Sequence, residues 1–404
     1  MPTLKYYVWL SRRVGAVAAG HVLRHFGSPE AAFFAQEDEY GKIESIDKSD
    51  AASLCKKELT TASSILARCT ELGHRILTIQ DAEYPERLRN IYDPPIVLYV
   101  KGRLPAIDEE AVIAIVGTRK STPYGMKMSE KCGYELARHG LVITTGLARG
   151  ADTAAALGAL RGGGSIIGVL GCGLDVIYPR ENDKLYEDVA ACGALITEYP
   201  PGTEPNGSHF PVRNRIMSGI SVGIAVIEAP LRSGALITAR LALDQGRDVF
   251  TMPGNVDAAM SAGTNSLLRD GAIPLTAPTD IVTEYADLFP LKIKTDHVGK
   301  VALDKRLERE MLANKEKPEI PTEKTVDKPP VSSYIDVEKT ALTLKGTEKT
   351  VFDALRKSGG RVHIDDIIAE TGIAASDALG SMTMLEIEGY VISQPGGIYS
   401  LPGM

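Results

Sequence analysis

The sequence has little cysteine and no long hydrophobic run. Among 404 residues there are five cysteines, and they are scattered: Cys55, Cys69, Cys132, Cys172 and Cys192. No CxxC pair occurs, and the seven histidines do not cluster with cysteines, so neither a disulfide framework nor a zinc site is expected. The start, MPTLKYYVWLSRR, lacks the apolar core of a signal peptide, and no run approaches the length of a membrane span. We therefore expect a cytoplasmic protein without membrane association.

The sequence also lacks an excess of positive charge. Its formal net charge is -7, which excludes a uniformly basic coat for nucleic acid. Any site for a polyanion must therefore be a local concentration of cations. A hydrophobic content of 44% with 24% charged residues is typical of a soluble globular protein, and the length predicts two or three domains.

Residues 1–85 have helical periodicity and are predicted to form an N-terminal helical domain. The run VGAVAAGHVLRHFGSPEAAFFA places apolar residues near a 3.6-residue period, interrupted at Gly27-Ser28-Pro29. Its first part, VGAVAAGHVL, fits the glycine turn of a helix-hairpin-helix (or SAM-like) module that grips the DNA backbone. A plain helical bundle packed on the next domain is the alternative, and it is the one we favour.

Residues 86–290 are predicted to form a Rossmann-like domain of the α/β class, a doubly wound parallel sheet. Short apolar runs such as AVIAIVG, LVITTG, SIIGVLG, ALITEY, SVGIAVIEA and DVFTMPG alternate with amphipathic helical segments. Strands that are apolar throughout and separated by helices are typical of a parallel sheet covered on both faces.

The remainder divides into a linker and a small domain. Residues 291–340 include KEKPEIPTEKTVDKPP, a charged and proline-rich composition that cannot build a core. Residues 341–404 regain apolar periodicity, with three helical segments followed by a short β-ribbon, and this order predicts a winged helix.

The connections of the predicted sheet concentrate glycines, hydroxyls and cations at the carboxyl ends of its strands, where ligands bind in open α/β sheets. Residues 111–290 carry 15 Lys and Arg against 18 Asp and Glu, yet these connections are locally positive. Glycines let backbone N–H groups approach an anion, and arginines contact its oxygens. The candidate residues are Gly117, Thr118, Arg119, Lys120, Ser121, Gly146, Arg149, Arg213, Asn214, Arg215, Arg232, Ser233 and Gly234.

The motifs for a dinucleotide cofactor and for a nucleoside triphosphate are both missing, so the expected ligand at this edge is a polymer that carries phosphates. The first connection reads GTRKSTPYG instead of the GxGxxG of dinucleotide-binding folds, and the second strand ends in Thr144-Thr145-Gly146 without an acid. No GxxxxGK[ST] motif occurs, and no Ser-His-Asp or paired-carboxylate arrangement is visible. We therefore expect no catalytic residue, no cofactor and no metal. Tyr124 and Phe210 flank the basic connections, where they could stack on bases.

With these residues the chain resembles the DNA-processing protein A (DprA, also called Smf) family. The resemblance covers about residues 85–290 and rests on ordered segments: VGTRKSTPYG, GLARGADTAA, LGCGLDVIYPREN, ITEYPPGTEP, FPVRNRIMSG, SGALITAR and QGRDVF..PGN. It implies a dimeric, non-enzymatic protein that binds single-stranded DNA and loads the RecA recombinase onto it during natural transformation or recombination. Such a protein displaces or works beside single-strand binding protein. The family's basic site corresponds to Arg119, Lys120, Arg213 and Arg215.

Two departures from the family pattern remove no cation. The family usually reads close to GIDAAAH after GLAR, whereas this chain has Ala151 and Ala156 in place of the isoleucine and histidine. SGALIT also replaces the commoner SGSLIT.

The alternative function is that of a nucleotide-phosphate ribohydrolase of the lysine-decarboxylase-like group, which uses a PGGxGTxxE motif. Here the corresponding EAPLRSGALITAR has Glu228 before the glycine and no acid after it, so the catalytic carboxylate of that group is missing. A regulatory interaction protein is a third class, which fits the winged helix alone.

Overall fold

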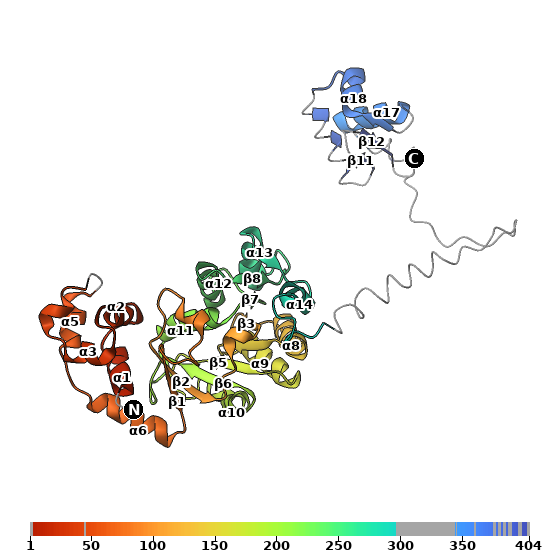
Figure 1. The fold of residues 1–404 in the computed structure, drawn as a ribbon. Helices are drawn as coiled ribbons and strands as arrows, with labels where there is room; N and C mark the ends of the chain where they lie inside the picture. The colour runs from red at the N-terminus through yellow and green to blue at the C-terminus, as the bar shows by residue number, and fades with distance from the viewer. Residues whose placement is uncertain are drawn as a thin grey trace. The chain divides into compact units, whose positions relative to one another are not determined.

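The computed structural model describes residues 3–43, 46–295, 344, 346–358, 361–374, 377–378, 381–382, 385–386, 390–394 and 398–401. The chain divides into two compact units, residues 1–315 and 316–404. The first unit holds the N-terminal helices and the sheet, and the second holds the C-terminal domain (Figure 1).

The N-terminal segment is a helical bundle that packs on the sheet. Trp9 and Leu10 are buried in the same apolar core as Val97 and Tyr99 of the sheet, which makes the bundle part of the first unit. The helix-hairpin-helix alternative stays a prediction. The helices of this segment are α1 (Leu4–Arg13), α2 (Ala16–Phe26), α3 (Pro29–Phe34), α4 (Glu37–Tyr40), α5 (Lys48–Leu54) and α6 (Thr60–Glu71).

The sheet has nine strands in the order β1-β2-β6-β5-β4-β3-β7-β8-β9. From β6 to β9 all neighbours are parallel, whereas β1 pairs antiparallel with β2, and β2 antiparallel with β6. The strands are β1 (Arg75–Thr78), β2 (Val97–Gly102), β3 (Val112–Val116), β4 (Val142–Thr145), β5 (Ile166–Val169), β6 (Ala194–Thr197), β7 (Gly223–Val226), β8 (Asp248–Thr251) and β9 (Ile273–Pro274).

Helices cover both faces of this sheet, as the apolar strands predict (Figure 1). Because side chains alternate along a strand, Ile113 and Ile115 of β3 face one core, and Val112, Ala114 and Val116 face the other. The first core is closed by α8 (Pro123–Arg138), α9 (Ala151–Arg161), α10 (Asp183–Cys192) and α14 (Pro278–Ala286), and the second by α7 (Glu86–Arg89), α11 (His209–Ile220) and α12 (Gly234–Asp244). Helix α13 (Ala262–Arg269) follows β8.

Local signals set where the helices next to β3 and β4 begin. At α8, Pro123 occupies the first turn and the Thr122 hydroxyl accepts the Gly125 N–H at 3.2 Å. Gly150 precedes α9 with φ +78°, and a Cβ there would lie 2.5 Å from the Thr118 carbonyl oxygen. The two connections therefore touch at the edge of the sheet.

Two elements differ from the sequence prediction. Residues 75–78, expected in a helical segment, form β1 at the edge of the sheet. Arg213 and Arg215, expected on a loop before the β7 strand, lie inside helix α11, so that expectation is wrong. The consecutive polar residues 213–215 hide the helical periodicity, because all three are buried by tertiary contacts that the local pattern does not show.

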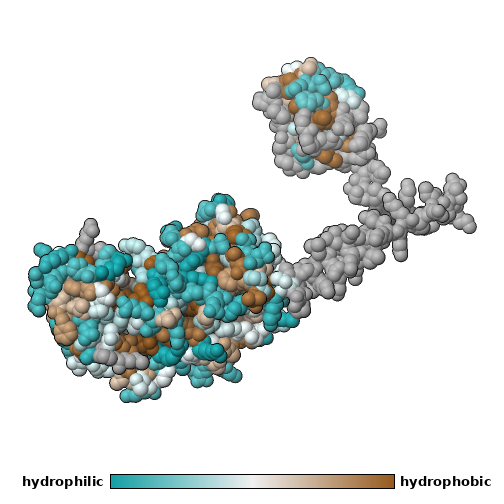
Figure 2. Space-filling model, in the orientation of Figure 1, coloured by the Kyte–Doolittle hydropathy of each residue, from teal (hydrophilic) through white to brown (hydrophobic). Residues whose placement is uncertain are grey.

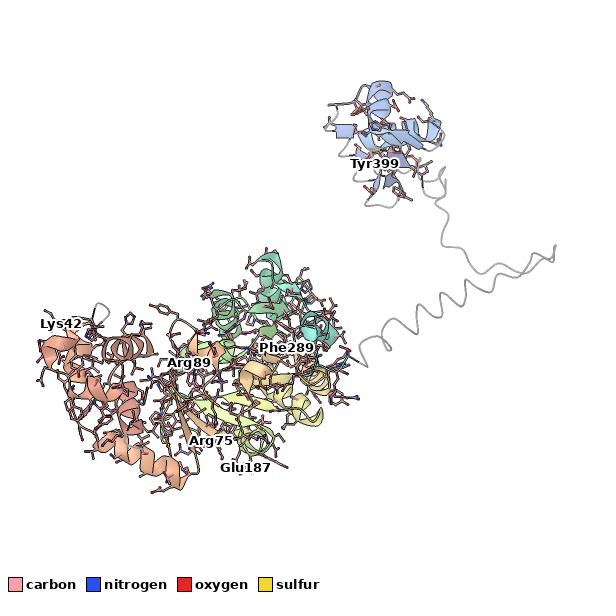
Figure 3. All side chains as sticks on the ribbon, in the orientation of Figure 1. Lys42, Arg75, Arg89, Glu187, Phe289 and Tyr399 are labelled. Atoms are coloured by element: carbon pink, nitrogen blue, oxygen red, sulfur yellow. The ribbon has the colours of Figure 1, made fainter. Side chains whose placement is uncertain are left out.

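The second unit contains α17 (Gly346–Lys357), β10 (Arg361–His363), α18 (Ile364–Thr371), β11 (Ile392–Gln394) and β12 (Ile398–Ser400). Its strands form a small antiparallel sheet in the order β10-β12-β11, to which Tyr399, labelled in Figure 3, belongs. The helices and ribbon agree with the predicted winged helix. From residue 296 on, the predicted linker lies outside the described residues, as does much of the third helical segment, 375–386.

The side chains of the first unit tie its helices and strands together (Figure 3). Arg89, for example, donates to the carbonyl oxygens of Ile79 at 3.0 Å and Tyr84 at 3.2 Å. The face in Figure 2 is mostly polar with scattered apolar residues. Among the described residues, no helix is both long and apolar enough to cross a bilayer.

Candidate nucleic-acid interface

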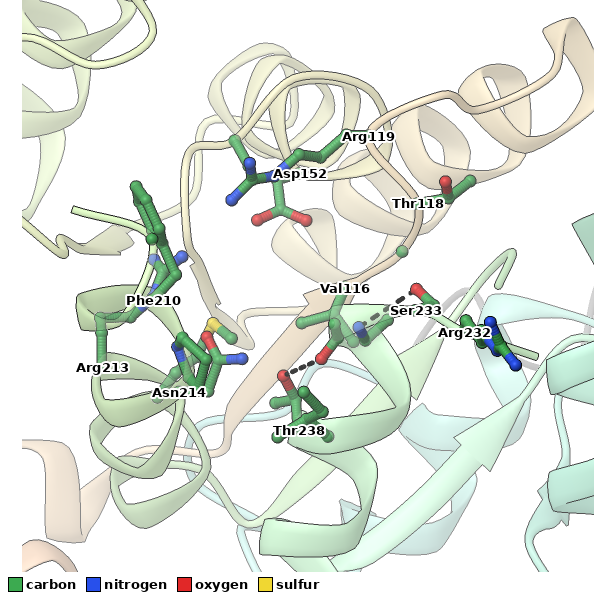
Figure 4. A pocket seen from close by; sticks show the side chains of 18 of the residues that line it. Val116, Thr118, Arg119, Asp152, Phe210, Arg213, Asn214, Arg232, Ser233 and Thr238 are labelled. Carbon is green, nitrogen blue, oxygen red and sulfur yellow. Dashed lines mark hydrogen bonds between the residues drawn. The ribbon is translucent and has the colours of Figure 1, made fainter. Parts of the chain in front are cut away.

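The sheet reverses its winding between β3 and β7. These two strands are parallel neighbours, but the chain continues from β3 toward β4 on one side and from β7 toward β8 on the other. Connections that diverge in this way leave a crevice at the carboxyl ends of the two strands. A hollow of about 520 Å³ lies there, between the connections after β3 and β7 and the start of α11 (Figure 4).

Most of the candidate residues line this hollow. They arrive from three separate parts of the chain, which the fold brings together at the switch point. The candidates that line it are Gly117, Thr118, Arg119, Arg213, Asn214, Arg232, Ser233 and Gly234. Lys120, Ser121, Gly146, Arg149 and Arg215 do not appear in its lining.

Arg119 and Arg232 are the open cations of the hollow. Both side chains are exposed, and within the described part of the chain neither forms an ion pair with a carboxylate. The guanidinium carbon of Arg119 lies 4.9 Å from the centre of the Phe210 ring, a cation–π contact that leaves its N–H groups available. An unpaired, exposed guanidinium is suited to contact the oxygens of a phosphate.

Aromatic rings form one wall of the hollow. Phe210 at the start of α11 lies 5.4 Å from Tyr178, measured between ring centres, and the planes of the two rings are tilted by 36°. Both residues line the hollow. Tyr178 is absent from the candidates, although it follows β5 in the segment VIYPREN, and the rule that ligands sit at carboxyl strand ends would have found it. Tyr124 lies on α8, outside the lining.

Arg213 lies buried beneath the surface of the hollow. The residue is 4% exposed, and its guanidinium donates to the Val169 carbonyl oxygen. Gly146 makes room for it, since a Cβ at that position would lie 2.3 Å from Nη1. Burial lowers the pKa of Arg213, and the nearby carboxylate of Asp152 opposes this shift.

Asp152 is the carboxylate on the floor of the hollow, and it is not among the residues that the sequence pattern singles out. Its side chain accepts the Gly146 N–H at 3.1 Å. Burial raises the pKa of this carboxyl, and Arg213 acts in the opposite direction. The signal was available, because Asp152 lies two residues after Gly150 in the connection that follows β4.

The two candidate arginines outside the hollow, Arg149 and Arg215, have acidic partners. Arg149 is exposed and pairs with Glu181, with 3.1 Å between Nη2 and Oε2. Arg215, with a side chain 5% exposed, pairs with Asp93 at 2.8 Å and with Glu198 at 2.6 Å. Arg215 is buried between its carboxylates and presents no free charge to a ligand, whereas Arg149 and Glu181 form an exposed pair.

The remaining candidates support the connection between β3 and α8. Lys120 is exposed, and its N–H donates to the Thr118 hydroxyl at 3.2 Å. Ser121 lies close to Gly125, where a Cβ would come within 2.9 Å of its hydroxyl oxygen. The Glu228 carboxylate accepts the N–H and the hydroxyl of Thr122, both at 2.8 Å, and thereby holds the start of α8. The Glu228 carboxylate therefore has a structural role at the start of α8.

No metal-binding cluster is found in the described ranges: no three His, Cys, Asp or Glu side chains gather there to hold an ion. The hollow therefore offers cations, aromatic rings and helix N-termini, with Asp152 as its buried carboxylate. This combination suits a ligand that carries both phosphates and bases.

Two parts of the chain match known protein families. Residues 75–286 match the family described as DNA recombination-mediator protein A, and residues 338–397 match the DprA winged helix domain. The protein Smf of Synechocystis is 32% identical over 399 residues, which is 97% of each chain. DNA processing protein DprA of Bacillus subtilis is 40% identical over 223 residues, covering 55% of this chain and 75% of the relative.

A solved structure supports the fold. The X-ray structure of DNA processing protein A from Streptococcus pneumoniae superposes with a TM-score of 0.61 at 32% sequence identity. It covers 69% of this chain and 97% of its own chain. Because the matched segments include the switch-point sheet with its hollow and the C-terminal winged helix, this chain belongs to the DNA recombination-mediator protein A family.

Proposed function

We propose that this protein binds single-stranded DNA at the switch-point hollow and loads a RecA recombinase onto it, in natural transformation or in homologous recombination. The observation that carries the proposal is the pair of open cations, Arg119 and Arg232, beside the Phe210–Tyr178 wall. Family membership supports a role as a DNA-processing recombination mediator.

Each part of the hollow has a use in such a complex. Arg119 and Arg232 contact backbone phosphates, and the N-terminus of α12 at Ser233 and Gly234 adds partial positive charge. Phe210 and Tyr178 offer π-faces on which bases stack without regard to sequence. The buried Arg213 holds the floor and contributes positive potential, which Asp152 moderates. Binding through phosphates and stacking predicts little discrimination between sequences.

The partners follow from the same role. We propose that the protein acts in the cytoplasm as a homodimer and works beside single-strand binding protein when it passes DNA to RecA. The exposed apolar side chains of Leu231, just before α12, and Leu243 on α12 support an interface with a second copy. No catalytic step is part of the proposal.

The first experiment compares ligands. Fluorescence anisotropy titrations with single- and double-stranded DNA of equal length, at several salt concentrations, measure affinity and its salt dependence. We expect preference for the single strand, affinity that grows with strand length, and little competition by nucleoside monophosphates. Tight binding of a mononucleotide with no length dependence would contradict the proposal.

The variant Arg119→Ala tests the proposed contact between Arg119 and a backbone phosphate. Because it removes a phosphate contact and the side chain is exposed, affinity should fall without loss of stability, and the salt slope should flatten by ~0.7. Arg269→Ala, at an exposed position on α13 away from the lining, controls for the change in net charge. Equal binding by both variants at every salt concentration would show that Arg119 contacts no DNA.

The alternative, a ribohydrolase that acts on nucleotide phosphates, has one observation in its favour. Asp152 is a buried carboxylate in a hollow, and its pKa is raised, which is common for catalytic acids. Its contacts with Gly146 and the neighbouring Arg213 offer a structural reason for the same carboxylate. An assay for free base released from nucleoside monophosphates separates the two: turnover that Asp152→Asn abolishes would favour the enzyme.

A further inference from the structure

Helix α8 carries a row of cations and aromatic residues along the side that faces solvent. The residues follow one another at intervals of three and four positions, the spacing that keeps side chains on one helix face. We call them the α8 stripe: Tyr124, Lys127, Lys131, Tyr134 and Arg138. All are exposed except Tyr134, which is half-buried.

The charges of the stripe are free. Over the residues that the structure describes, none of Lys127, Lys131 and Arg138 forms an ion pair. Arg138 instead lies over the Tyr134 ring, 5.7 Å from its centre, and donates to the Tyr134 hydroxyl at 3.4 Å. Two acids border the stripe: Glu130 pairs with Arg161, and Glu135 lies half-buried on the other side.

The chain runs from the hollow directly into the stripe. The segment Gly117–Arg119 lines the hollow, Lys120 follows it on the surface, and Thr122 caps α8. At a rise of about 1.5 Å per residue, the stripe extends ~21 Å along α8 from Tyr124 to Arg138. In chain order Tyr124 is the first residue of the stripe after Arg119, and the two lysines follow it.

We propose that the α8 stripe is a second segment of the single-stranded DNA path. Lys127, Lys131 and Arg138 contact successive parts of the backbone, while Tyr124 stacks on a base that leaves the hollow. A row of cations with an exposed aromatic ring at its head suits a nonspecific single-strand track, and a net negative protein must confine such a track to local stripes. This inference rests on the proposed function and adds a longer binding site to it.

Oligonucleotides of two lengths distinguish binding at the stripe from binding at the hollow. The double variant Lys127→Ala/Lys131→Ala is titrated with an oligonucleotide of about 5 nucleotides and with one of about 20. Affinity for the short strand should stay at the wild-type value, because the hollow alone holds it. Affinity for the long strand should fall on the order of 10-fold at low salt, and its salt slope should flatten by ~1.4.

The control is Lys48→Ala/Lys184→Ala, which removes two exposed lysines from α5 and α10 and changes the net charge equally. If both double variants bind the long strand equally well, the inference is overturned. If the wild type fails to bind the long strand at all, the proposed function itself fails. Sedimentation of the stripe variant identifies the other possible occupant: a changed oligomeric state with unchanged DNA affinity would make the stripe an interface between copies.

The tyrosine at the head of the stripe has its own test. Tyr124→Ala should weaken long-strand binding between about 5-fold and about 100-fold, since stacking on one ring is lost. Tyr124→Phe should bind like the wild type, because it keeps the ring and removes only the hydroxyl. Loss of binding in both variants would argue against stacking.

Discussion

At the scale of residues, Arg119, Arg213 and Arg215 show how surroundings decide what a guanidinium does. Arg119 is open to solvent and rests on the Phe210 ring, so its charge is available to a ligand. Arg213 is buried beside Asp152 and donates to the backbone of β5. Arg215 is buried between two carboxylates. We therefore propose that Arg119 contacts DNA and that Arg215 contributes to the stability of the fold.

Arg215→Ala should destabilise the protein, because it leaves the Asp93 and Glu198 carboxylates without their partner. Breaking a buried ion pair in this way costs about 3 kcal/mol. Burial already raises the pKa of Glu198, and the contact with Arg215 limits that rise. A carboxyl whose pKa is higher in the folded state stabilises the protein at pH values below its ordinary pKa. This contribution is lost as pH rises through the pKa of the folded state. The destabilisation should hence be larger at neutral pH than below the ordinary pKa of a glutamate.

Urea unfolding of the wild type and of Arg215→Ala, at neutral pH and below the ordinary pKa of a glutamate, measures this difference. The folded variant should keep the wild-type salt slope for DNA, in contrast to Arg119→Ala. A stable variant with a flattened salt slope would place Arg215 in the DNA site after all.

At the scale of elements, helices α8 and α11 each pack on the sheet and also carry residues of the proposed DNA site. The buried face of α11 packs on the sheet through Ile216, Met217 and Ile220, while its first turns supply Phe210 and Arg213 to the hollow. Helix α8 buries Cys132 and Leu136 against the opposite face and leaves its stripe in solvent. Because each helix is anchored along one whole side, its functional residues are held on a rigid support.

The winged helix has the wrong charge for a DNA reader. Residues 341–404 carry 5 Lys and Arg against 8 Asp and Glu, and α18 contains only acidic charged residues, Asp365, Asp366 and Glu370. A reader of that composition would be repelled by the phosphate backbone. Removal of 341–404, which lies within the second compact unit, should leave affinity for single-stranded DNA nearly unchanged in anisotropy titrations. A large loss of affinity would assign DNA contacts to this domain; otherwise a protein-contacting or regulatory role remains our proposal.

At the scale of the whole molecule, the N-terminal bundle and the sheet share one apolar core. Trp9 and Leu10 of α1 belong to the same core as Tyr99 of β2, and β1 covers the edge of β2. The boundary at residue 85 that the sequence suggests therefore runs through a packed structure and separates β1 from β2.

Deletion of residues 1–85 should lower the thermal midpoint and promote aggregation, because it exposes the apolar surface around Tyr99 and turns β2 into an open edge strand. The control is the deletion of 341–404, which removes residues of the second unit alone and should leave the midpoint of the first unit unchanged. Calorimetry of both truncations measures the difference. Equal midpoints would show that the bundle adds little to the stability of the sheet.

The sequence alone determined the alternation of strands and helices, the two-faced burial of β3 and the carboxyl edge at which glycines and arginines gather, because these depend on periodicity and chain order. It also predicted that Gly117–Arg119 and Arg232–Gly234 lie at the same edge of the sheet, where both segments line the hollow. Only the tertiary structure decided which arginines remain open. The partners of Arg149 and Arg215 come from other segments of the chain, and ion pairing depends on distance in space. For the same reason Asp152, buried against Arg213, and Tyr178, packed on Phe210, emerged as parts of the site after the sheet had brought their connections together.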